Sequence, residues 1–285
     1  MRIAIIGSKG QLGSALLNVF ADEDCLEIDL PAHDITDLAE ICETMSGFSP
    51  NLVVHTAAMT NVDGCERNPE LAYRVNVLGT RNVAVAAQQV GARLVYISTD
   101  YVFDGEKGSP YIESDCPRPL SAYGISKLGG EYAVRYIMEK YYMVRLCGLY
   151  GHAGCVGKGS TNFVEMVIKR AAEKKEIRVV SDQIVTPTST TDVSRKLFEL
   201  IEKGKYGIYH MTNTGSCSWY EFAAEIVKLA GMDAEVLPLT AEQFGARAMR
   251  PGYSVLDNLN LRRAGLDDLR NWKEALKDYI ESRNN

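Results

Sequence analysis

The feature that most constrains the fold of this chain is a run of three glycines that follows an apolar segment at its start. Residues Ile3–Ile6 read as a short strand, and Gly7, Gly10 and Gly13 follow it before a helical pattern of apolar residues begins. Gly7 permits a tight turn, Gly10 lets the backbone approach a pyrophosphate, and Gly13 lets the helix pack closely on a sheet. A flexible glycine loop is the simpler alternative, but the position between a strand and a helix favours a dinucleotide site.

A second predicted strand, Leu26–Asp29, ends in a carboxylate. Dinucleotide-binding folds present an acidic side chain near this point to the adenosine ribose, so Asp29 is a candidate ribose ligand. Asp34 is the other candidate, placed to meet the adenine edge. Either aspartate could instead cap the helix that follows, although Asp37 is the better candidate for that cap.

Residues 98–127 contain the polar side chains expected of a catalytic site. Thr99 ends a predicted strand, and Tyr123 and Lys127 lie four positions apart on a predicted helix. This spacing puts both side chains on one face, so we expect the lysine to lower the pKa of the phenol and make Tyr123 a proton donor. The Thr99 hydroxyl would bond the same carbonyl oxygen that the tyrosine protonates. Tyr-x-x-x-Lys alone is a weak pattern, and the glycine motif gives it weight.

Strands alternate with helical patterns over the first 150 residues. The apolar runs are Ile3–Ile6, Leu26–Asp29, Leu52–His55, Leu94–Ser98 and Met143–Leu146. This alternation predicts an α/β fold with a doubly wound parallel sheet, and ligands of such folds bind beyond the carboxyl ends of the strands.

The predicted domain organisation has two parts. Residues 1–150, with part of 184–215, are expected to form a dinucleotide-binding domain, and residues 151–183 and 216–285 a smaller, discontinuous α/β substrate-binding domain. The glycine-rich segment 148–159 breaks the strand–helix pattern, so we expect a mobile loop at the entry to the smaller domain.

Composition excludes several classes of function. With 285 residues and a formal net charge of −6, the chain lacks the basic excess of a nucleic-acid-binding protein. Its seven cysteines form no Cys-x-x-Cys pair and are odd in number, which indicates a reducing compartment. No apolar stretch reaches membrane-spanning length and the first strand follows Met1 without a cleavable leader, so we expect a cytoplasmic protein. The four histidines show no ligand spacing, and no metal site is predicted.

Taken together, the motifs resemble those of the extended short-chain dehydrogenase/reductase superfamily and, within it, the dTDP-4-dehydrorhamnose reductase family. The resemblance spans nearly the whole chain and rests on the glycine motif, on Tyr123-x-x-x-Lys127, and on the segments 55–63, 76–80, 98–105, 182–183, 186–188 and 250–251. Thr99 is the discriminating residue, because many other members place serine there. The resemblance implies a Rossmann-like fold and reduction, by NADPH or NADH, of the C4 ketone of dTDP-4-dehydro-L-rhamnose to dTDP-L-rhamnose.

The same resemblance assigns roles to individual residues. The catalytic residues would be Thr99, Tyr123 and Lys127, the lysine also holding the nicotinamide ribose. The cofactor site would comprise Gly7, Lys9, Gly10, Gln11, Leu12, Gly13, Asp29, Asp34, Ile35, Ala57, Ala58, Thr60, Asn76, Tyr123 and Lys127. The substrate site would comprise Thr99, Asp100, Tyr101, Asn162, Phe163 and Arg250, with Arg250 as the partner of the diphosphate. Tyr101 could instead be a core aromatic residue, and Arg250 a solvated loop cation.

Several alternatives stay open at this stage. The protein could be a reductase or epimerase of another nucleotide-deoxysugar, or a non-catalytic regulatory subunit of the methionine adenosyltransferase type. Cofactor preference is balanced, because Asp29 would repel the 2′-phosphate of NADPH and Lys9 would attract it. Some members of the family bridge two subunits through magnesium held by acidic side chains, but this chain has Ser14 and Ala15 near the relevant position. A metal-bridged dimer is therefore not expected, and a monomer or a homodimer is.

Overall fold

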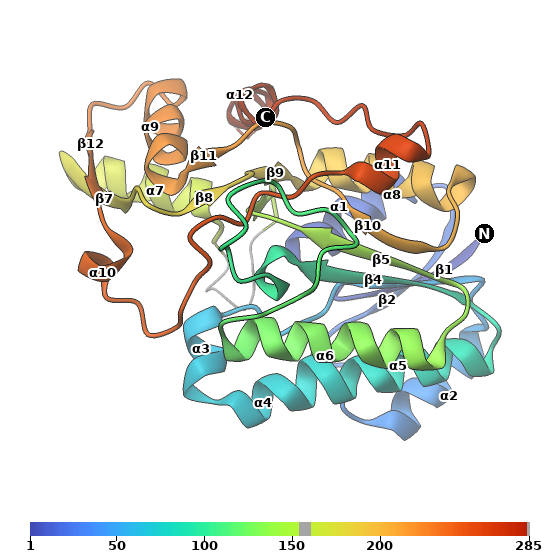
Figure 1. Ribbon diagram of the computed structural model, residues 1–285. Helices are drawn as coiled ribbons and strands as arrows, with labels where there is room; N and C mark the ends of the chain where they lie inside the picture. Colours follow the sequence, from blue (N-terminus) through green and yellow to red (C-terminus); the bar gives the residue numbers. More distant parts are fainter. Residues whose placement is uncertain (154–160, 284–285) are drawn as a thin grey trace.

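The computed structural model describes residues 1–153 and 161–283, and in this part of the chain a six-stranded parallel sheet forms the centre (Figure 1). The chain moves from β1 (Arg2–Ile6) to β2 (Asp24–Ile28) on one side and then returns to place β3 (Leu52–His55) on the other side of β1. Such a reversal is the topological switch point at which α/β sheets bind ligands, beyond the carboxyl ends of the strands. In spatial order the strands are β2 (Asp24–Ile28), β1 (Arg2–Ile6), β3 (Leu52–His55), β4 (Arg93–Thr99), β5 (Tyr141–Leu146) and β10 (Gly207–His210).

Helices cover both faces of this sheet, which confirms the predicted fold class (Figure 1). Successive side chains of a strand point to opposite faces, and in β1 both sets are apolar. Ile3 and Ile5 face one core, Ala4 and Ile6 the other. The first core is covered by α1 (Gln11–Val19), α8 (Thr190–Lys203) and α11 (Leu259–Arg263), the second by α2 (Leu38–Phe48), α5 (Thr80–Gln89) and α6 (Ala122–Ile137).

Helix α11 lies within residues 216–285, which the predicted domain organisation assigns to the smaller unit. Leu261, Leu266 and Leu269 are buried in the same core as Ile3 and Ile5. They lie there because α11 returns to pack against the edge strand β10. The predicted division of the chain into two domains remains a prediction.

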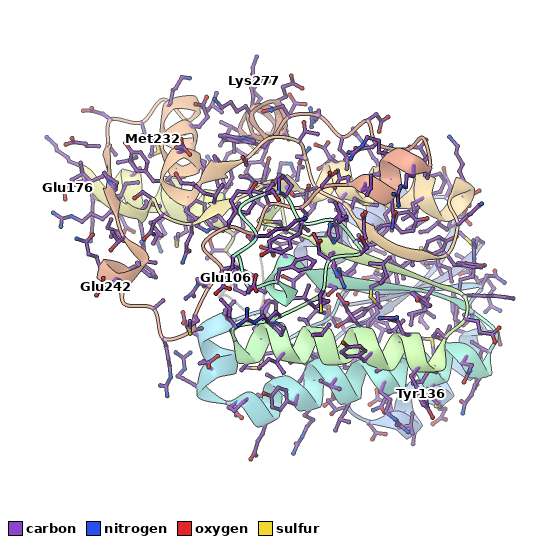
Figure 2. The ribbon with its side chains drawn as sticks, viewed as in Figure 1. Glu106, Tyr136, Glu176, Met232, Glu242 and Lys277 are labelled. Carbon is purple, nitrogen blue, oxygen red and sulfur yellow. The ribbon has the colours of Figure 1, made fainter. Side chains whose placement is uncertain are left out.

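The smaller unit lies beyond one end of the sheet (Figure 1). Its core is rich in aromatic side chains such as Phe222 and Trp272, and Glu176, Met232 and Glu242 lie at its outer edge (Figure 2). It contains α7 (Phe163–Glu173), α9 (Trp219–Leu229), α10 (Ala241–Phe244), α12 (Trp272–Ser282) and the parallel pair β7 (Glu176–Val180) and β12 (Glu235–Leu239). Two short strand pairs complete the connections: β6 (Leu149–Tyr150) with β9 (Thr188–Ser189), and β8 (Ile184–Val185) with β11 (Cys217–Ser218).

Half of the predicted mobile loop at 148–159 lies outside the described residues, which omit 154–160. Its first part is ordered, since residues 149 and 150 form β6.

Short helical segments connect the strands near the carboxyl edge of the sheet. After β3 come α3 (Val62–Arg67), α4 (Pro69–Tyr73) and a π-helical turn (Arg74–Gly79) that runs into α5, and after β4 comes a 3₁₀ turn (Asp100–Val102). Side-chain caps fix where these helices start, as Asn61 accepts a hydrogen bond from Gly64 N at 2.9 Å. The predicted cap at Asp37 is confirmed, because its Oδ1 accepts a hydrogen bond from Glu40 N at 3.1 Å at the start of α2.

Helix α6 lies unusually close to β4. Gly130 makes this possible, because a Cβ added there would lie 2.2 Å from the Tyr96 hydroxyl and 2.7 Å from the Asn76 carbonyl oxygen. The Tyr96 hydroxyl also donates a hydrogen bond to Lys127 O at 3.2 Å. This contact holds the part of α6 that carries Tyr123 and Lys127 against the end of the strand that carries Thr99.

Gly130→Ala tests this close approach. The added methyl group would force α6 away from Tyr96 and from the backbone at Asn76, so we expect the free energy of unfolding to fall by about 1–3 kcal/mol. Gly47→Ala is the matched control, because Gly47 lies within α2 and a Cβ there has no atom within 4 Å. The control should gain up to ~1 kcal/mol from helix propensity. Urea unfolding measures both variants, and equal stability of the two would contradict the close packing.

Candidate active site

The three predicted catalytic residues come together at the carboxyl end of β4. Thr99 is the last residue of that strand, and its hydroxyl donates a hydrogen bond to Asp100 Oδ1 at 2.9 Å. The Tyr123 hydroxyl lies within hydrogen-bonding reach of Thr99.

Local structure at the start of α6 aims Tyr123 at this strand end. Ser121 caps the helix by accepting a hydrogen bond from Gly124 N at 3.2 Å. Gly124 allows the first turn to lie against the 3₁₀ turn, because a Cβ there would lie 2.3 Å from Tyr101 O. The rings of Tyr101 and Tyr123 consequently meet edge to face, with their centroids 5.5 Å apart.

The acidity of Tyr123 differs from the prediction. Burial of its hydroxyl raises the pKa of Tyr123 well above its usual value, and nearby Asp100 and Tyr101 raise it further, against a smaller lowering by the Thr99 hydrogen bond. The net shift is upward, toward a weaker acid. The expectation that the lysine lowers this pKa is therefore wrong for the protein alone.

The reason lies in the direction of the lysine side chain. Lys127 Nζ donates a hydrogen bond to Ile97 O at 2.7 Å and lies 4.3 Å from the centre of the Tyr96 ring. Burial lowers the pKa of Lys127 to about 7, although Glu131 opposes the shift. Lys127 can thus gain or lose a proton near neutral pH.

Glu131 is itself fixed in a buried ion pair. Arg145 donates two hydrogen bonds to it, from Nε to Oε1 at 2.8 Å and from Nη2 to Oε2 at 2.7 Å, and Ser98 Oγ donates a third at 2.7 Å. Both members of the pair are only 2% exposed. This bidentate geometry compensates both charges beneath the site.

Asp100 lies behind Thr99 rather than at the surface, with 4% of its area exposed. Besides the Thr99 hydroxyl it accepts a hydrogen bond from Cys147 Sγ at 3.2 Å, and Ser254 is within hydrogen-bonding reach. Burial raises the pKa of Asp100, and these hydrogen bonds oppose the rise. Asp100 thus reaches the predicted substrate site through the Thr99 hydroxyl.

The glycine loop has the geometry of an anion cradle. Gly7 has a φ of +83°, which favours glycine, and a Cβ at Gly13 would lie 2.1 Å from Gly7 O. Helix α1 starts at Gln11 without a side-chain cap, so its first N–H groups face outward. Ser8 Oγ and Gln11 Oε1 are buried and have no hydrogen-bond partner among the described residues. Free N–H groups and these orphaned oxygens fit a dinucleotide pyrophosphate and its ribose.

The two residues predicted to compete over cofactor choice lie side by side. Asp29 accepts hydrogen bonds from Lys9 N at 2.9 Å and Leu30 N at 2.8 Å, and Lys9 Nζ donates one to Leu30 O at 3.2 Å. Asp34 is exposed and accepts a hydrogen bond from Thr36 N, whereas Ile35 is buried and packs where Gly79 has no side chain.

The other predicted cofactor residues lie on the loop after β3. Ala57 N donates a hydrogen bond to Ile6 O at 3.1 Å, which places this loop, including Ala58 and Thr60, beside the glycine loop. Asn76 joins the loop to α6: its Oδ1 accepts a hydrogen bond from Met59 N at 2.8 Å and its Nδ2 donates one to Ser126 Oγ at 2.9 Å. Leu12, also predicted here, is buried in the core under α1.

The predicted substrate residues fall into two groups. Tyr101 lies beside Tyr123, within hydrogen-bonding reach of Arg250, and it is neither fully buried nor a core residue. Arg250 is 18% exposed and pairs with Asp63, so it is not a solvated cation. Asn162 and Phe163 lie at the start of α7 instead, where Asn162 caps the helix and Phe163 packs on Trp219 with the ring centroids 4.6 Å apart.

Sequence reasoning missed Asp63 and Ser254. Asp63 is 187 positions from Arg250, and no local pattern reveals such a pair. The short spacing of Ser254 after Arg250 and Pro251 was the only available signal for that residue.

Two features are absent from the described residues. No group of three or more histidine, cysteine, aspartate or glutamate side chains is placed to hold a metal ion. No helix in residues 1–153 and 161–283 has the length and apolar character needed to cross a membrane.

Comparison with known proteins gives matches along the whole chain. The family described as the RmlD substrate binding domain matches residues 1–285. A spore coat polysaccharide biosynthesis protein, SpsK of Bacillus subtilis, is 37% identical over 99% of this chain and 98% of its own length. The dTDP-4-dehydrorhamnose reductase of Streptomyces griseus is 38% identical over 97% of this chain and 92% of its own length.

Solved structures agree with these relatives. A dTDP-4-dehydrorhamnose reductase of Clostridium acetobutylicum has a TM-score of 0.94 and 43% identity over 99% of both chains. That of Bacillus anthracis, solved in complex with NADP, has a TM-score of 0.94 and 42% identity over 98% of both chains.

The pH dependence of stability tests the buried lysine. At pH 6 Lys127 is charged in both the folded and the unfolded chain, and burying that charge destabilises the fold. Between a folded pKa of about 7 and the ordinary value of 10.5, only the unfolded chain keeps the proton, so wild-type stability should rise with pH across this window. Lys127→Met removes the charge, so its stability relative to wild type should be greatest at pH 6 and decline toward pH 10.

Urea unfolding of both proteins without added cofactor measures this difference. The lost hydrogen bond to Ile97 O adds an offset that does not depend on pH, so the slope carries the test. A difference that stays constant from pH 6 to pH 10 would show that Lys127 has an ordinary pKa.

Proposed function

Because the chain belongs to the RmlD substrate-binding domain family, whose members include the dTDP-4-dehydrorhamnose reductases, we propose that it reduces dTDP-4-dehydro-L-rhamnose to dTDP-L-rhamnose with NADPH or NADH. The observation that carries this proposal is the position of Thr99, Tyr123 and Lys127. They meet at the carboxyl end of β4, on the same edge of the sheet as the glycine loop. A ketone held there would have a proton donor on one side and the cofactor site on the other.

A raised pKa suits Tyr123 to the role of acid. The reduced cofactor, with its pyrophosphate in the cradle formed by the glycine loop, would supply a hydride to the C4 carbonyl carbon. The negative charge then developing on the oxygen is far more basic than a phenolate, so Tyr123 gives up its proton despite the raised pKa. Because the phenol stays protonated at neutral pH in the free protein, the acid is ready before the substrate arrives.

Thr99 and Lys127 support this transfer. The Thr99 hydroxyl can turn its proton from Asp100 to the ketone oxygen and so stabilise the developing charge. Lys127, with a pKa of about 7, would hold the nicotinamide ribose, and it can take up and release a proton near neutral pH.

The remaining site residues are proposed from their positions. Tyr101 would contact the sugar beside Tyr123, and Asp100 would act on it through Thr99. Arg250 is proposed as the partner of the diphosphate, and Asn162 and Phe163 would lie at the nucleotide end, in the smaller unit. The cofactor residues proposed are those of the glycine loop, the end of β2 and the loop after β3.

We further propose that the protein acts in the cytoplasm on a small-molecule substrate, as a monomer or a homodimer and without nucleic acid or membrane. The cysteines of the described residues are free thiols, which suits a reducing compartment. The net charge of −6 disfavours nucleic acid as a partner.

A direct assay tests the reaction. Purified protein mixed with reduced cofactor and dTDP-4-dehydro-L-rhamnose should oxidise the cofactor and form dTDP-L-rhamnose, without any other protein. Product analysis with other dTDP-4-keto sugars distinguishes this activity from that of a related reductase or an epimerase. A pure protein that binds the cofactor but turns over none of these substrates would contradict the proposal.

Tyr123→Phe should lower kcat by a factor of about 10² to 10⁴, because the general acid is lost. Cofactor affinity, measured by fluorescence titration, should stay within about twofold, since the ring remains. Tyr136→Phe is the control on the same helix, because Tyr136 is 91% exposed and projects from its far end (Figure 2). A Tyr123→Phe enzyme as active as Tyr136→Phe would remove Tyr123 from the mechanism.

Cofactor choice should be balanced, with kcat/KM for NADPH and NADH within about tenfold, a difference of ~1.4 kcal/mol. Lys9 would attract the 2′-phosphate of NADPH, and Asp29, which lies beside it, would repel this phosphate. Both side chains are at least partly exposed to solvent, so each effect is small. Lys9→Ala should shift the ratio toward NADH, and Asp29→Asn toward NADPH. Asparagine is chosen because it keeps an acceptor for the backbone N–H groups of Lys9 and Leu30. An unchanged ratio in Lys9→Ala would mean that its ammonium does not reach the phosphate.

A further inference from the structure

An ion pair joins α3 of the sheet unit to a loop near the end of the chain. Asp63 Oδ2 accepts a hydrogen bond from Arg250 Nη2 at 2.9 Å, and Asp63 Oδ1 accepts one from Ala248 N at 2.9 Å. Arg250 Nη1 also donates a hydrogen bond to Ala248 O at 3.0 Å. The carboxylate therefore fixes both the backbone of this loop and the side chain of its arginine.

The same arginine reaches the catalytic loop. Its guanidinium lies within hydrogen-bonding reach of Tyr101, whose ring meets that of Tyr123 at 5.5 Å. The loop backbone is in close contact there as well, because a Cβ added to Gly105 would lie 2.8 Å from Gly252 N. Arg250 thus connects Asp63 to the tyrosine next to the proposed acid.

This pair differs from an ordinary surface ion pair. Asp63 is 31% and Arg250 18% exposed, and the carboxylate has two anchored hydrogen bonds. Burial alone would raise the pKa of Asp63, but the hydrogen bonds from Arg250 and Ala248 outweigh it and lower this pKa. The backbone of Asp63 is fixed as well, because it lies in the first turn of α3, which Asn61 caps.

We propose that Asp63 is a positioning residue for the reduction: it holds Arg250 against Tyr101 and thereby fixes the Tyr101 hydroxyl beside Tyr123. This inference rests on the proposed function, because it takes Tyr101 to contact the sugar whose ketone Tyr123 protonates. An arginine side chain without such an anchor has many rotamers and would leave the phenol free to turn. A small displacement of the groups that orient a substrate is enough to slow a reaction severely.

Asp63→Asn is the primary test, because asparagine keeps the shape and one acceptor but loses the charge that anchors Arg250. We expect kcat to fall about tenfold with the proposed sugar nucleotide, while the Kd of NADPH stays within about twofold of wild type. Asp257→Asn is the matched control. Asp257 also pairs with an arginine in the C-terminal part of the chain, Arg262 at 2.7 Å, but it has no contact with Tyr101 among the described residues. The control should keep the wild-type kcat.

A double-mutant cycle with Tyr101→Phe distinguishes positioning from a general loss of structure. If Asp63 acts through Tyr101, adding Asp63→Asn to Tyr101→Phe should lower kcat by less than twofold more. Arg250→Gln removes the other member of the ion pair, and it serves as the test if Asp63→Asn fails to fold. Adding Asp63→Asn to Arg250→Gln should likewise have little further effect.

Three results would overturn the inference. The first is a kcat of Asp63→Asn equal to that of Asp257→Asn. The second is a fall in kcat, when Asp63→Asn is added to Tyr101→Phe, as large as the fall that Asp63→Asn causes in the wild-type enzyme. The third is tighter binding of dTDP by Asp63→Asn than by the wild-type enzyme. The last would show that the aspartate merely shields an anion site. An inactive wild-type protein would instead contradict the proposed function, so the two failures are distinguishable.

Discussion

The site depends on one packing contact, the close approach of α6 to β4. Gly130 lets the helix lie against the Tyr96 hydroxyl, and this brings Lys127 and Tyr123 to the end of the strand, where Lys127 is buried and Tyr123 is half-buried. Desolvation disfavours the charged form of any group. It therefore raises the pKa of the phenol and lowers that of the lysine, and both shifts follow from the same contact. A wider spacing between helix and strand would return both groups to their ordinary acidities.

Helix α6 also connects the proposed cofactor site to the proposed proton donor. Asn76 bonds both the loop after β3 and Ser126 on α6, so the proposed cofactor loop and the proposed acid share one support. Glu131, one turn beyond Lys127, is fixed by Arg145 on β5. The orientation of the face of α6 that carries Tyr123 and Lys127 is thus fixed by two contacts. One is with the sheet, and the other is with the loop after β3. A reductase needs this rigidity, because the hydride and the proton must reach adjacent atoms of one carbonyl group.

Local sequence patterns were enough to predict strands, turns and helix caps, because these depend on residues that are close together in the chain. The apolar runs placed the first five strands of the sheet to within one or two residues, the glycine spacing located the turn before α1, and Asp37 was identified as a cap. The direction of the Lys127 side chain was not predictable, because it depends on a carbonyl of β4 and on the Tyr96 ring, which only the folded chain brings near. The return of α11 to the edge of the sheet escaped prediction for the same reason.

The central claim is that burial, rather than the neighbouring lysine, sets the acidity of Tyr123 in the free enzyme. Incorporating tyrosine labelled with ¹³C at the ζ carbon and following its NMR signal against pH measures this directly, with Tyr123→Phe identifying the resonance. Without cofactor, the account predicts that the Tyr123 signal stays in its protonated position at about pH 10, where a tyrosine of a model peptide is half ionised. A Tyr123 signal that titrates with a midpoint at or below about pH 10 would contradict it.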